Sequence, residues 1–320
     1  MTHHPEILRA DPWAGRHLES RALLRQAQAG RLVRISHGRY VDAESWNAMD
    51  GLERHRLRTL AVASTAATDN VFSHHAAAAL WRIPLLGDWP DRVDVTGPVR
   101  SGGRSSEQIR RHPSAAIPAE QIGTTDGVRL TSPARTVVDL ARVLPFPEAV
   151  VAIDAACRIG RAAPKALLAE VRDLSCAARG RRGGRRAADA AAFATDQSES
   201  VWESVSRVTI RRLGFPDPVL QQEFRWDDRT SYRTDFWWPE YGVVGEFDGL
   251  VKYGSGEGDE ARSALVREKI REDRLRTLSS GFVRWTASDV RDPLRLARLL
   301  GAAGLPRPTR RLAYANDFSG

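Results

Sequence analysis

Cysteine is almost absent from this sequence of 320 residues: Cys157 and Cys176 are the only two, nineteen positions apart. That spacing provides neither a disulfide framework nor the close pairs that bind structural zinc. Histidine is absent from most of the chain, because all eight histidines lie within the first 112 residues. Any chemistry in the C-terminal half must therefore rely on carboxylates, lysine, arginine and water.

Lysine is scarce as well. Lys165, Lys252 and Lys269 are the only lysines, so arginine supplies nearly all of the positive charge behind the net charge of +8. Arginine is suited to bidentate contacts with phosphate, although a GC-rich coding sequence gives the same bias.

No apolar run approaches the roughly 18 residues of a membrane span, and the N-terminus has no apolar signal core. We therefore expect a cytoplasmic protein of two or three domains with no membrane segment.

Residues 1–50 have the pattern of a winged helix. Apolar residues recur at helical spacing from Leu18 to Ala27, and Gly30 is well placed just past the end of that helix. Two short apolar runs then flank a turn at residues 36–38, which is typical of a hairpin. We expect this region to bind DNA through Arg21, Arg25, Arg31, Arg34, His37 and Arg39. The alternative is an ordinary solvated surface in an arginine-rich protein.

The next segment, residues 51–176, mixes helical and strand patterns and predicts an α/β domain. The expected elements are a helix at 52–62, a helix capped by Ser73, strands near 93–96 and 127–130, and a helix opened by Ser132 and Pro133. His74 and His75 are adjacent in this segment and cannot both face one metal ion from the same helix.

Arginine and glycine then dominate residues 179–186. We interpret this run as the core of a flexible basic linker over residues 177–197. Such a linker either adds phosphate contacts between two nucleic-acid-binding modules or serves only as a soluble connection.

The last part of the chain, residues 198–305, predicts a mixed sheet flanked by helices and followed by a tail at 306–320. The expected elements are a helix at 198–213, strands at 219–226, 232–238 and 243–248, a long polar helix at 260–279, a strand at 282–286 and a helix at 288–300. The whole chain is thus expected to be a multidomain protein of the α+β or α/β class.

Carboxylates converge on the predicted sheet. Asp235 lies near the end of the second strand, while Glu246 and Asp248 share one face of the third strand, because strand side chains alternate. Clustered carboxylates repel one another unless a cation lies between them, and oxygen ligands favour Mg²⁺ or Mn²⁺. We therefore expect Asp235, Glu246 and Asp248 to bind such an ion. The alternative is that Val244, Glu246 and Asp248 form the wet side of an amphipathic strand.

A metal ion at this position suits phosphodiester hydrolysis, because it polarises the phosphate and lowers the pKa of a bound water. Glu203, on the preceding helix, could reach the cluster or orient the water. Lys252 could stabilise developing negative charge, and Lys269 lies on the long helix. The expected catalytic set is Glu203, Asp235, Glu246, Asp248, Lys252 and Lys269.

The C-terminal residues resemble a known group of enzymes. The segments that carry the resemblance are Glu203-Ser-Val-Ser-Arg207, Gly214-Phe-Pro-Asp-Pro-Val219, Thr234-Asp235-Phe236, Gly245-Glu-Phe-Asp-Gly249, Arg271-Glu-Asp-Arg274 and Gly281-Phe-Val-Arg284. They look like the very-short-patch-repair-like domain of the PD-(D/E)xK nuclease superfamily. The resemblance implies that Asp235 and Glu246 are the two metal-binding acids and that Glu203 is the first-helix acid. Asp248 stands where the superfamily has lysine, which leaves open whether Lys252 or Lys269 substitutes or whether the domain binds DNA without cutting it.

The N-terminal half carries a second resemblance, in the segments Gly30-Arg-Leu-Val-Arg34, Gly38-Arg-Tyr-Val41, residues 73–80 and Leu130-Thr-Ser-Pro-Ala-Arg-Thr-Val-Val-Asp-Leu-Ala141. These segments are similar to the antitoxin family of the AbiE type IV toxin-antitoxin systems. The resemblance implies a winged helix that binds operator DNA, followed by an antitoxin domain and a cognate toxin as partner. A homodimer would suit a palindromic operator. Arg135 and Asp139 are four residues apart, which favours an internal ion pair over a site.

Two functions follow from these patterns. The first is a DNA-binding protein with a Mg²⁺- or Mn²⁺-dependent endonuclease domain that acts in defence or repair. The second is a transcriptional regulator or antitoxin that does not cut DNA. A scaffold without a nucleic-acid ligand is a third possibility, and it predicts no steep salt dependence of duplex binding.

Overall fold

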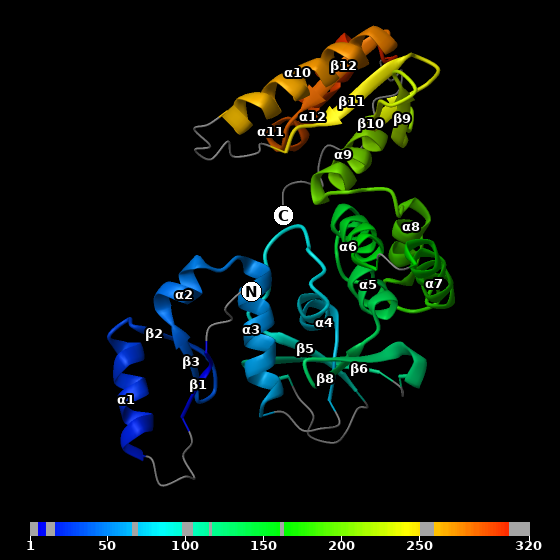
Figure 1. The fold of residues 1–320 in the computed structure, drawn as a ribbon. Helices are drawn as coiled ribbons and strands as arrows, with labels where there is room; N and C mark the ends of the chain where they lie inside the picture. The colour runs from blue at the N-terminus through cyan, green and yellow to red at the C-terminus, as the bar shows by residue number, and fades with distance from the viewer. Residues whose placement is uncertain are drawn as a thin grey trace. The chain divides into compact units, whose positions relative to one another are not determined.

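The computed structural model describes residues 6–10, 17–65, 70–97, 105–114, 117–160, 163–249 and 259–306. The chain divides into two compact units, residues 1–194 and residues 195–320. The described part contains helices and three mixed or antiparallel sheets, which confirms the expected combination of helix and sheet (Figure 1).

The first unit begins with a small antiparallel sheet and three helices. Its elements are β1 (Leu8–Arg9), α1 (His17–Gln28), β2 (Leu32–Ser36), β3 (Arg39–Asp42), α2 (Ala43–Ala48) and α3 (Gly51–Ala63). The strands lie in the order β1-β3-β2, and Ile35, Val41, Trp46 and Leu57 form the core beneath them. The order of helix and hairpin is the one that the sequence predicted.

A five-stranded sheet follows in the same unit. Its elements are β4 (Val71–Phe72), α4 (His74–Leu80), β5 (Val93–Gly97), β6 (Ile109–Pro113), the 3-10 helix η1 (Ala119–Gln121), β7 (Ile122–Thr125), β8 (Val128–Thr131) and α5 (Pro133–Ala141). The strand order is β6-β5-β4-β8-β7. Phe72, Leu80, Val95 and Leu130 form the core that joins this sheet to its helices.

Ser73 occupies the N-cap position of α4 but makes no capping hydrogen bond. Its hydroxyl accepts a hydrogen bond from Thr96 instead, at 2.7 Å. The expected capping role of Ser73 is therefore wrong, because its side chain is used within a buried polar cluster. Ser132, in contrast, caps α5 by accepting a hydrogen bond from the Arg135 backbone N–H.

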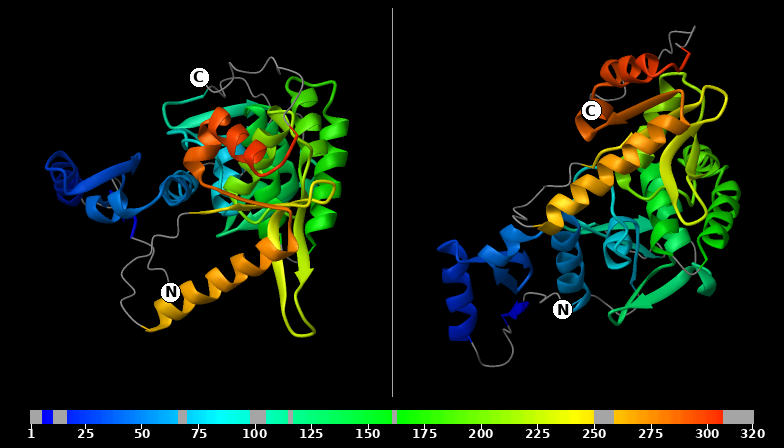
Figure 2. Two further views of the ribbon diagram at one scale, coloured as in Figure 1. Left: turned by 90° about the horizontal axis from the view of Figure 1, so that it is seen from above. Right: turned by 45° about the horizontal axis from the view of Figure 1, so that its top comes forward.

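Four helices pack together at the end of the first unit (Figures 1 and 2). They are α5, α6 (Phe146–Ile159), α7 (Pro164–Ala177) and α8 (Gly184–Phe193). We expected a flexible linker over residues 177–197, but α8 lies within that segment and buries Ala187 and Ala190 completely. Alanine has the highest helix propensity and packs closely, so this basic segment is part of the folded unit.

The second unit is a four-stranded mixed sheet with helices. Its elements are α9 (Val201–Arg212), β9 (Val219–Arg225), β10 (Ser231–Trp238), β11 (Val243–Phe247), α10 (Asp259–Leu278), β12 (Gly281–Trp285), α11 (Ala287–Arg291) and α12 (Pro293–Ala302). The strand order is β12-β11-β10-β9, and β11 and β12 are parallel. The helix predicted at residues 288–300 is divided into α11 and α12. The division lies at Asp292, whose side chain caps the N-terminus of α12.

Aromatic rings pack the centre of the second unit. Phe236, Trp238 and Trp285 are fully buried there. Gly245 on β11 is required by this packing, since a Cβ on it would lie 2.7 Å from the Trp285 ring. Among the described helices of both units, none combines the length and hydrophobicity needed to cross a membrane.

Candidate functional site

The predicted DNA-binding residues lie along α1 and the β2–β3 hairpin. Arg21 and Arg25 are one turn apart on α1, and both are exposed. Arg31 and Arg34 are also exposed. None of the ion pairs between described side chains involves these four arginines. Their exposure leaves the guanidinium groups accessible to an anionic partner.

Polar contacts within the hairpin and with Gln108 hold its turn. Nη2 of Arg34 lies 3.1 Å from Nδ1 of His37. The hydroxyl of Ser36 donates to Oε1 of Gln108, at 3.1 Å. Arg39 differs from the other five predicted DNA-binding residues, because it is half-buried. Its Nε donates to Ser64 Oγ at 3.1 Å. Arg39 thus positions the hairpin against the end of α3.

The predicted acids of the second unit meet on neighbouring strands. The pairing of Phe236 with Gly245 places Asp235 beside Glu246 on the adjacent strand. Oδ2 of Asp235 accepts a hydrogen bond from the Phe247 backbone N–H, at 2.9 Å. Glu246 is 5% exposed, and its neighbour Val244 is fully buried. These residues therefore do not form the wet face that we considered as an alternative.

Glu203 is the third acid in this group. It lies in the first turn of α9 and is 8% exposed. Its Oε2 accepts hydrogen bonds from the Glu199 backbone N–H at 2.9 Å and from Gln221 Nε2 at 3.2 Å. Burial, followed by the negative charge of Glu203, raises the pKa of Asp235 to about 7. A carboxyl that resists ionisation near neutral pH is the electrostatic sign of an acid cluster.

Glu246, unlike Asp235, has arginine partners. Arg271 on α10 donates to both of its carboxylate oxygens. Arg284, which pairs with Glu246 in the β11–β12 register, donates to Oε2 at 2.9 Å. Both arginines also bind Glu268, at 3.1 and 3.0 Å. Hydrogen bonding to Glu246 and its charge hold the pKa of both guanidinium groups above the usual value, against the effect of burial.

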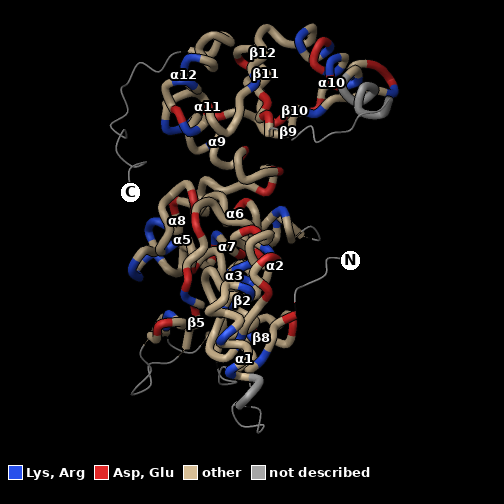
Figure 3. Tube along the Cα trace, turned by 90° about the vertical axis from the view of Figure 1, so that its left-hand side faces the viewer, with Lys and Arg blue, Asp and Glu red and all other residues tan. Residues whose placement is uncertain are grey.

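The other expected catalytic residues are Asp248, Lys269 and Lys252. Asp248 is half-buried just after β11, and its backbone N–H donates to the Trp285 carbonyl at 2.7 Å. Lys269 is exposed on α10, where acidic and basic residues alternate (Figure 3). Lys252 lies outside the described residues. The acids whose charges raise the pKa of Asp235 are Glu203 and, to a smaller extent, Glu246.

A metal ion fits this cluster only in part. Within the described ranges, no three His, Cys, Asp or Glu side chains are arranged as a ligand set. Asp235 and Glu203 present carboxylate oxygens, as a hard cation requires. Glu246 is held by Arg271 and Arg284, so it would have to release one of them to bind a cation.

Sequence reasoning did not include Arg271 and Arg284 in the site. Both occur in the segments that carry the nuclease resemblance, but nothing in their spacing shows that they bind Glu246. Arg284 could have been found from the parallel pairing of β11 with β12, which places it beside Glu246. The contact of Arg271 depends on how α10 packs, and no local pattern records that.

Comparison with known proteins gives one family match. A family model described as the AbiEi antitoxin C-terminal domain matches residues 60–186. Two curated relatives from Mycobacterium tuberculosis are each 29% identical over 278 residues, which is 85% of this chain and 92% of the relative. They are Uncharacterized protein MT2308 of strain CDC 1551 / Oshkosh and Uncharacterized protein Rv2248 of strain ATCC 25618 / H37Rv.

The family match lies entirely within the first unit, from the end of α3 to the start of α8. It supports the antitoxin part of the resemblance and does not extend to the predicted nuclease region at residues 198–305. Over residues 60–186, this chain is therefore similar to the C-terminal domain of AbiEi antitoxins.

Proposed function

We propose that this chain is a DNA-binding antitoxin of the AbiEi type, which regulates transcription from operator DNA and opposes a cognate toxin. The single observation that carries this proposal is the match of residues 60–186 to the AbiEi antitoxin C-terminal domain. Of the two functions that the sequence suggested, this match favours the regulator over the nuclease.

The surface of α1 and the hairpin supports the DNA-binding part of the proposal. As a winged helix, α1 would lie in the major groove with Arg21 and Arg25 toward the duplex, and His37 would lie at the tip of the wing. Arg21 and Arg25 are exposed and form no ion pair within the described part of the chain, so no such pair has to break when they bind phosphate. A homodimer would present two such surfaces to a palindromic operator.

Duplex affinity measured across a range of salt concentrations tests this part. We expect the Arg21→Ala/Arg25→Ala variant to weaken binding and to reduce the slope of log affinity against log salt by about 0.9 for each lost phosphate contact. The exposed Arg185 on α8 lies outside the proposed surface, so Arg185→Ala is the matched control. Equal affinities and slopes for the two variants would contradict the proposed surface.

The antitoxin part has its own test. Production of the full chain should restore growth to cells that express the cognate toxin. The Arg21→Ala/Arg25→Ala variant should still restore growth, since the family match lies outside α1. Failure of the wild-type chain to protect would contradict the antitoxin assignment while leaving DNA binding intact.

A second candidate function for the second unit is phosphodiester hydrolysis. The observation that favours it is the proximity of Asp235 to Glu203 and Glu246. A Mg²⁺ or Mn²⁺ ion would be held by these carboxylates and would supply polarisation of the phosphate. Supercoiled, linear and mismatched DNA incubated with the ion or with chelator tests this candidate. Nicking that disappears with chelator and in Asp235→Ala/Glu246→Ala would support it, whereas intact DNA under every condition would contradict it.

A further inference from the structure

A hollow of about 770 Å³ lies within the first unit and is rich in arginine. Residues of α4, β5, β6, α5 and α8 line it, together with the turn before α8. The charged side chains among its described lining residues are Arg135, Asp139, Arg142, Arg181, Arg182 and Arg186. Five arginines therefore face one carboxylate, and the hollow has a strong excess of positive charge.

Close backbone packing brings the arginine–glycine run to this hollow. Gly183 has a φ of +75°, and a Cβ on it would lie 2.0 Å from the Arg142 carbonyl oxygen. The neighbouring Gly184 is just as close to Ala178, since a Cβ on Gly184 would lie 1.7 Å from the Ala178 carbonyl oxygen. Only glycine permits both contacts. The turn is further held by the Arg142 side chain, whose Nε donates to the Arg182 carbonyl at 3.1 Å.

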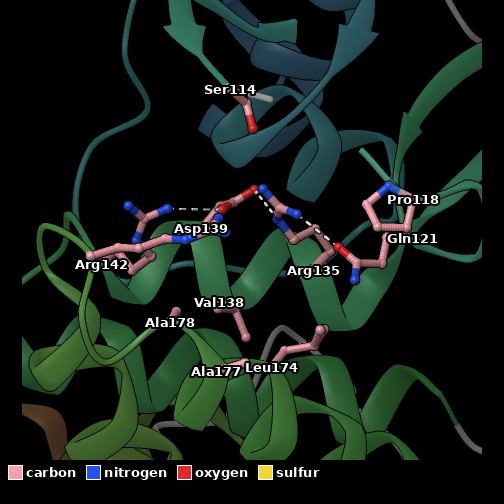
Figure 4. Close-up of a pocket in the computed structure, with 11 residues that line it drawn as sticks. Ser114, Pro118, Gln121, Arg135, Val138, Asp139, Arg142, Leu174, Ala177 and Ala178 are labelled. Atoms are coloured by element: carbon pink, nitrogen blue, oxygen red, sulfur yellow. Dashed lines mark hydrogen bonds and ion pairs between the residues drawn. The ribbon is translucent and has the colours of Figure 1, made fainter. Parts of the chain in front are cut away.

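Two of the arginines are held by the same carboxylate, Asp139. Nε of Arg135 donates to Oδ2 of Asp139 at 2.8 Å, and its Nη1 donates to Gln121 at 2.7 Å. Arg142 lies 3.5 Å from the other oxygen of Asp139. Figure 4 shows this arrangement in the adjoining pocket, where Asp139 lies between the two guanidinium groups. The expected ion pair of Arg135 and Asp139 is thus confirmed, and it forms part of the wall.

Arg181 and Arg182 are different, because both are exposed and neither has an acid partner among the described residues. A single carboxylate, Asp139, is already shared between two other arginines. Within the described part of the chain, no carboxylate therefore compensates the charges of Arg181 and Arg182, which line the hollow. Exposed arginines of this kind are suited to bidentate contacts with phosphate oxygens.

The opposite wall carries an oriented imidazole. Nε2 of His112 donates to Oδ1 of Asp94 at 2.8 Å, and Asp94 is completely buried. The ring of His74 stacks on His112 with 3.8 Å between centroids. His75 occupies the second oxygen of Asp94, at 3.0 Å. Since Asp94 holds the proton on Nε2, the ring of His112 is fixed in one orientation beside the arginines.

We propose that this hollow binds the phosphate groups of a nucleotide-sized small molecule through Arg181 and Arg182, with Arg142 and His112 as the walls. The charge matches a polyphosphate, and the volume lies within the roughly 300–1,000 Å³ of small-molecule pockets. This inference goes beyond the proposed DNA-binding function and uses a surface formed by α4, β5, β6, α5, α8 and the turn before α8.

Isothermal titration of the full chain with inorganic pyrophosphate and with ATP tests the proposal in low-salt buffer. Both probes should bind the wild-type protein. Arg181→Ala/Arg182→Ala should weaken each probe by about tenfold or more, because charge-assisted contacts are lost. Arg185→Ala is the control, since Arg185 is an equally exposed arginine of the same segment that does not line the hollow.

Three outcomes would overturn the proposal. The first is no binding of either probe to the wild-type chain at millimolar concentration. The second is equal affinity of wild type and Arg181→Ala/Arg182→Ala for both probes, since unchanged affinity would place the probes elsewhere. The third is displacement of ATP by a short DNA duplex, with loss of duplex binding in the same variant. That result would assign the arginines to nucleic acid, not to a small molecule.

Discussion

Asp235→Asn should stabilise the second unit at neutral and alkaline pH. Asp235 has no arginine that donates a hydrogen bond to it among the described contacts, and burial and the charge of Glu203 raise its pKa to about 7. Asparagine keeps an oxygen that can accept the hydrogen bond from the Phe247 N–H. The substitution therefore removes a costly charge and preserves the local geometry.

The size of the effect follows from the pKa. Between the ordinary value of 3.8 and about 7, the unfolded chain has lost this proton while the folded chain retains it. The free energy of unfolding then falls by about 1.4 kcal/mol for each pH unit, so stability is lost as pH rises. The full shift corresponds to about 4 kcal/mol. Because this group is partly exposed, we expect about 2 kcal/mol at pH 8.

Hydrogen exchange of peptides from residues 231–247 at increasing urea concentration measures this local stability. The buffer should contain chelator, so that no cation contributes. At pH 8 the midpoint for Asp235→Asn should exceed that of the wild type, and at pH 4 the two should agree. A variant that is less stable than wild type at pH 8, or an equal difference at both pH values, would refute the electrostatic argument.

Two further perturbations concern the first unit. Gly183→Ala should cost about 2–4 kcal/mol, since the residue needs a positive φ and its Cβ would meet the Arg142 carbonyl; Gly180→Ala, with open space around it, is the control in thermal unfolding. Burial lowers the pKa of His55 and of His74 to about 4. Each should therefore contribute about 3 kcal/mol of stability that is present above pH 6.5 and lost as the pH falls to 4. Hydrogen exchange of α3 and α4 peptides measures the loss, and protection independent of pH over this range would contradict it.

Most local elements could be predicted from the sequence because their signals are local. Ser132 and Pro133 mark the start of α5, and Asp126 and Gly127 form the turn that leads into β8. The strands of the second unit were predicted within about two residues, since alternation and turn residues bound each of them. Strands such as β4 and β6 were missed, because a strand of two residues has no period and β6 carries charged residues.

The linker prediction failed for a physical reason. A run of arginine and glycine is typical of a mobile connection, because glycine favours many conformations and arginines repel one another. Here the glycines permit close contact with the Arg142 and Ala178 carbonyls, and α8 that follows buries alanines against the other helices. The same composition therefore produces a compact turn when tertiary contacts select one conformation.

The acid cluster was predicted in part, because alternation along a strand places Glu246 but does not reveal its partners. Arg271 and Arg284 reach it from elements 25 and 38 residues away in sequence. The charge of the buried Glu246 carboxylate is balanced by two guanidinium groups, whereas Asp235 keeps its proton up to about pH 7. Glu246 therefore has a structural role in its ion pairs, whereas Asp235 is the acid whose protonation state can change near neutral pH.

Addition of Mg²⁺ tests whether Asp235 binds a cation or whether the acids of the second unit serve only in internal contacts. A divalent cation that binds Asp235 favours its ionised form, so Mg²⁺ should raise the urea midpoint of the wild type at pH 8 and remove the loss of stability between pH 4 and 7. Asp235→Asn should show no such response. Equal midpoints with chelator and with Mg²⁺ in the wild type would contradict a cation site at Asp235 and would leave the ion pairs with Arg271 and Arg284 as the observed role of Glu246.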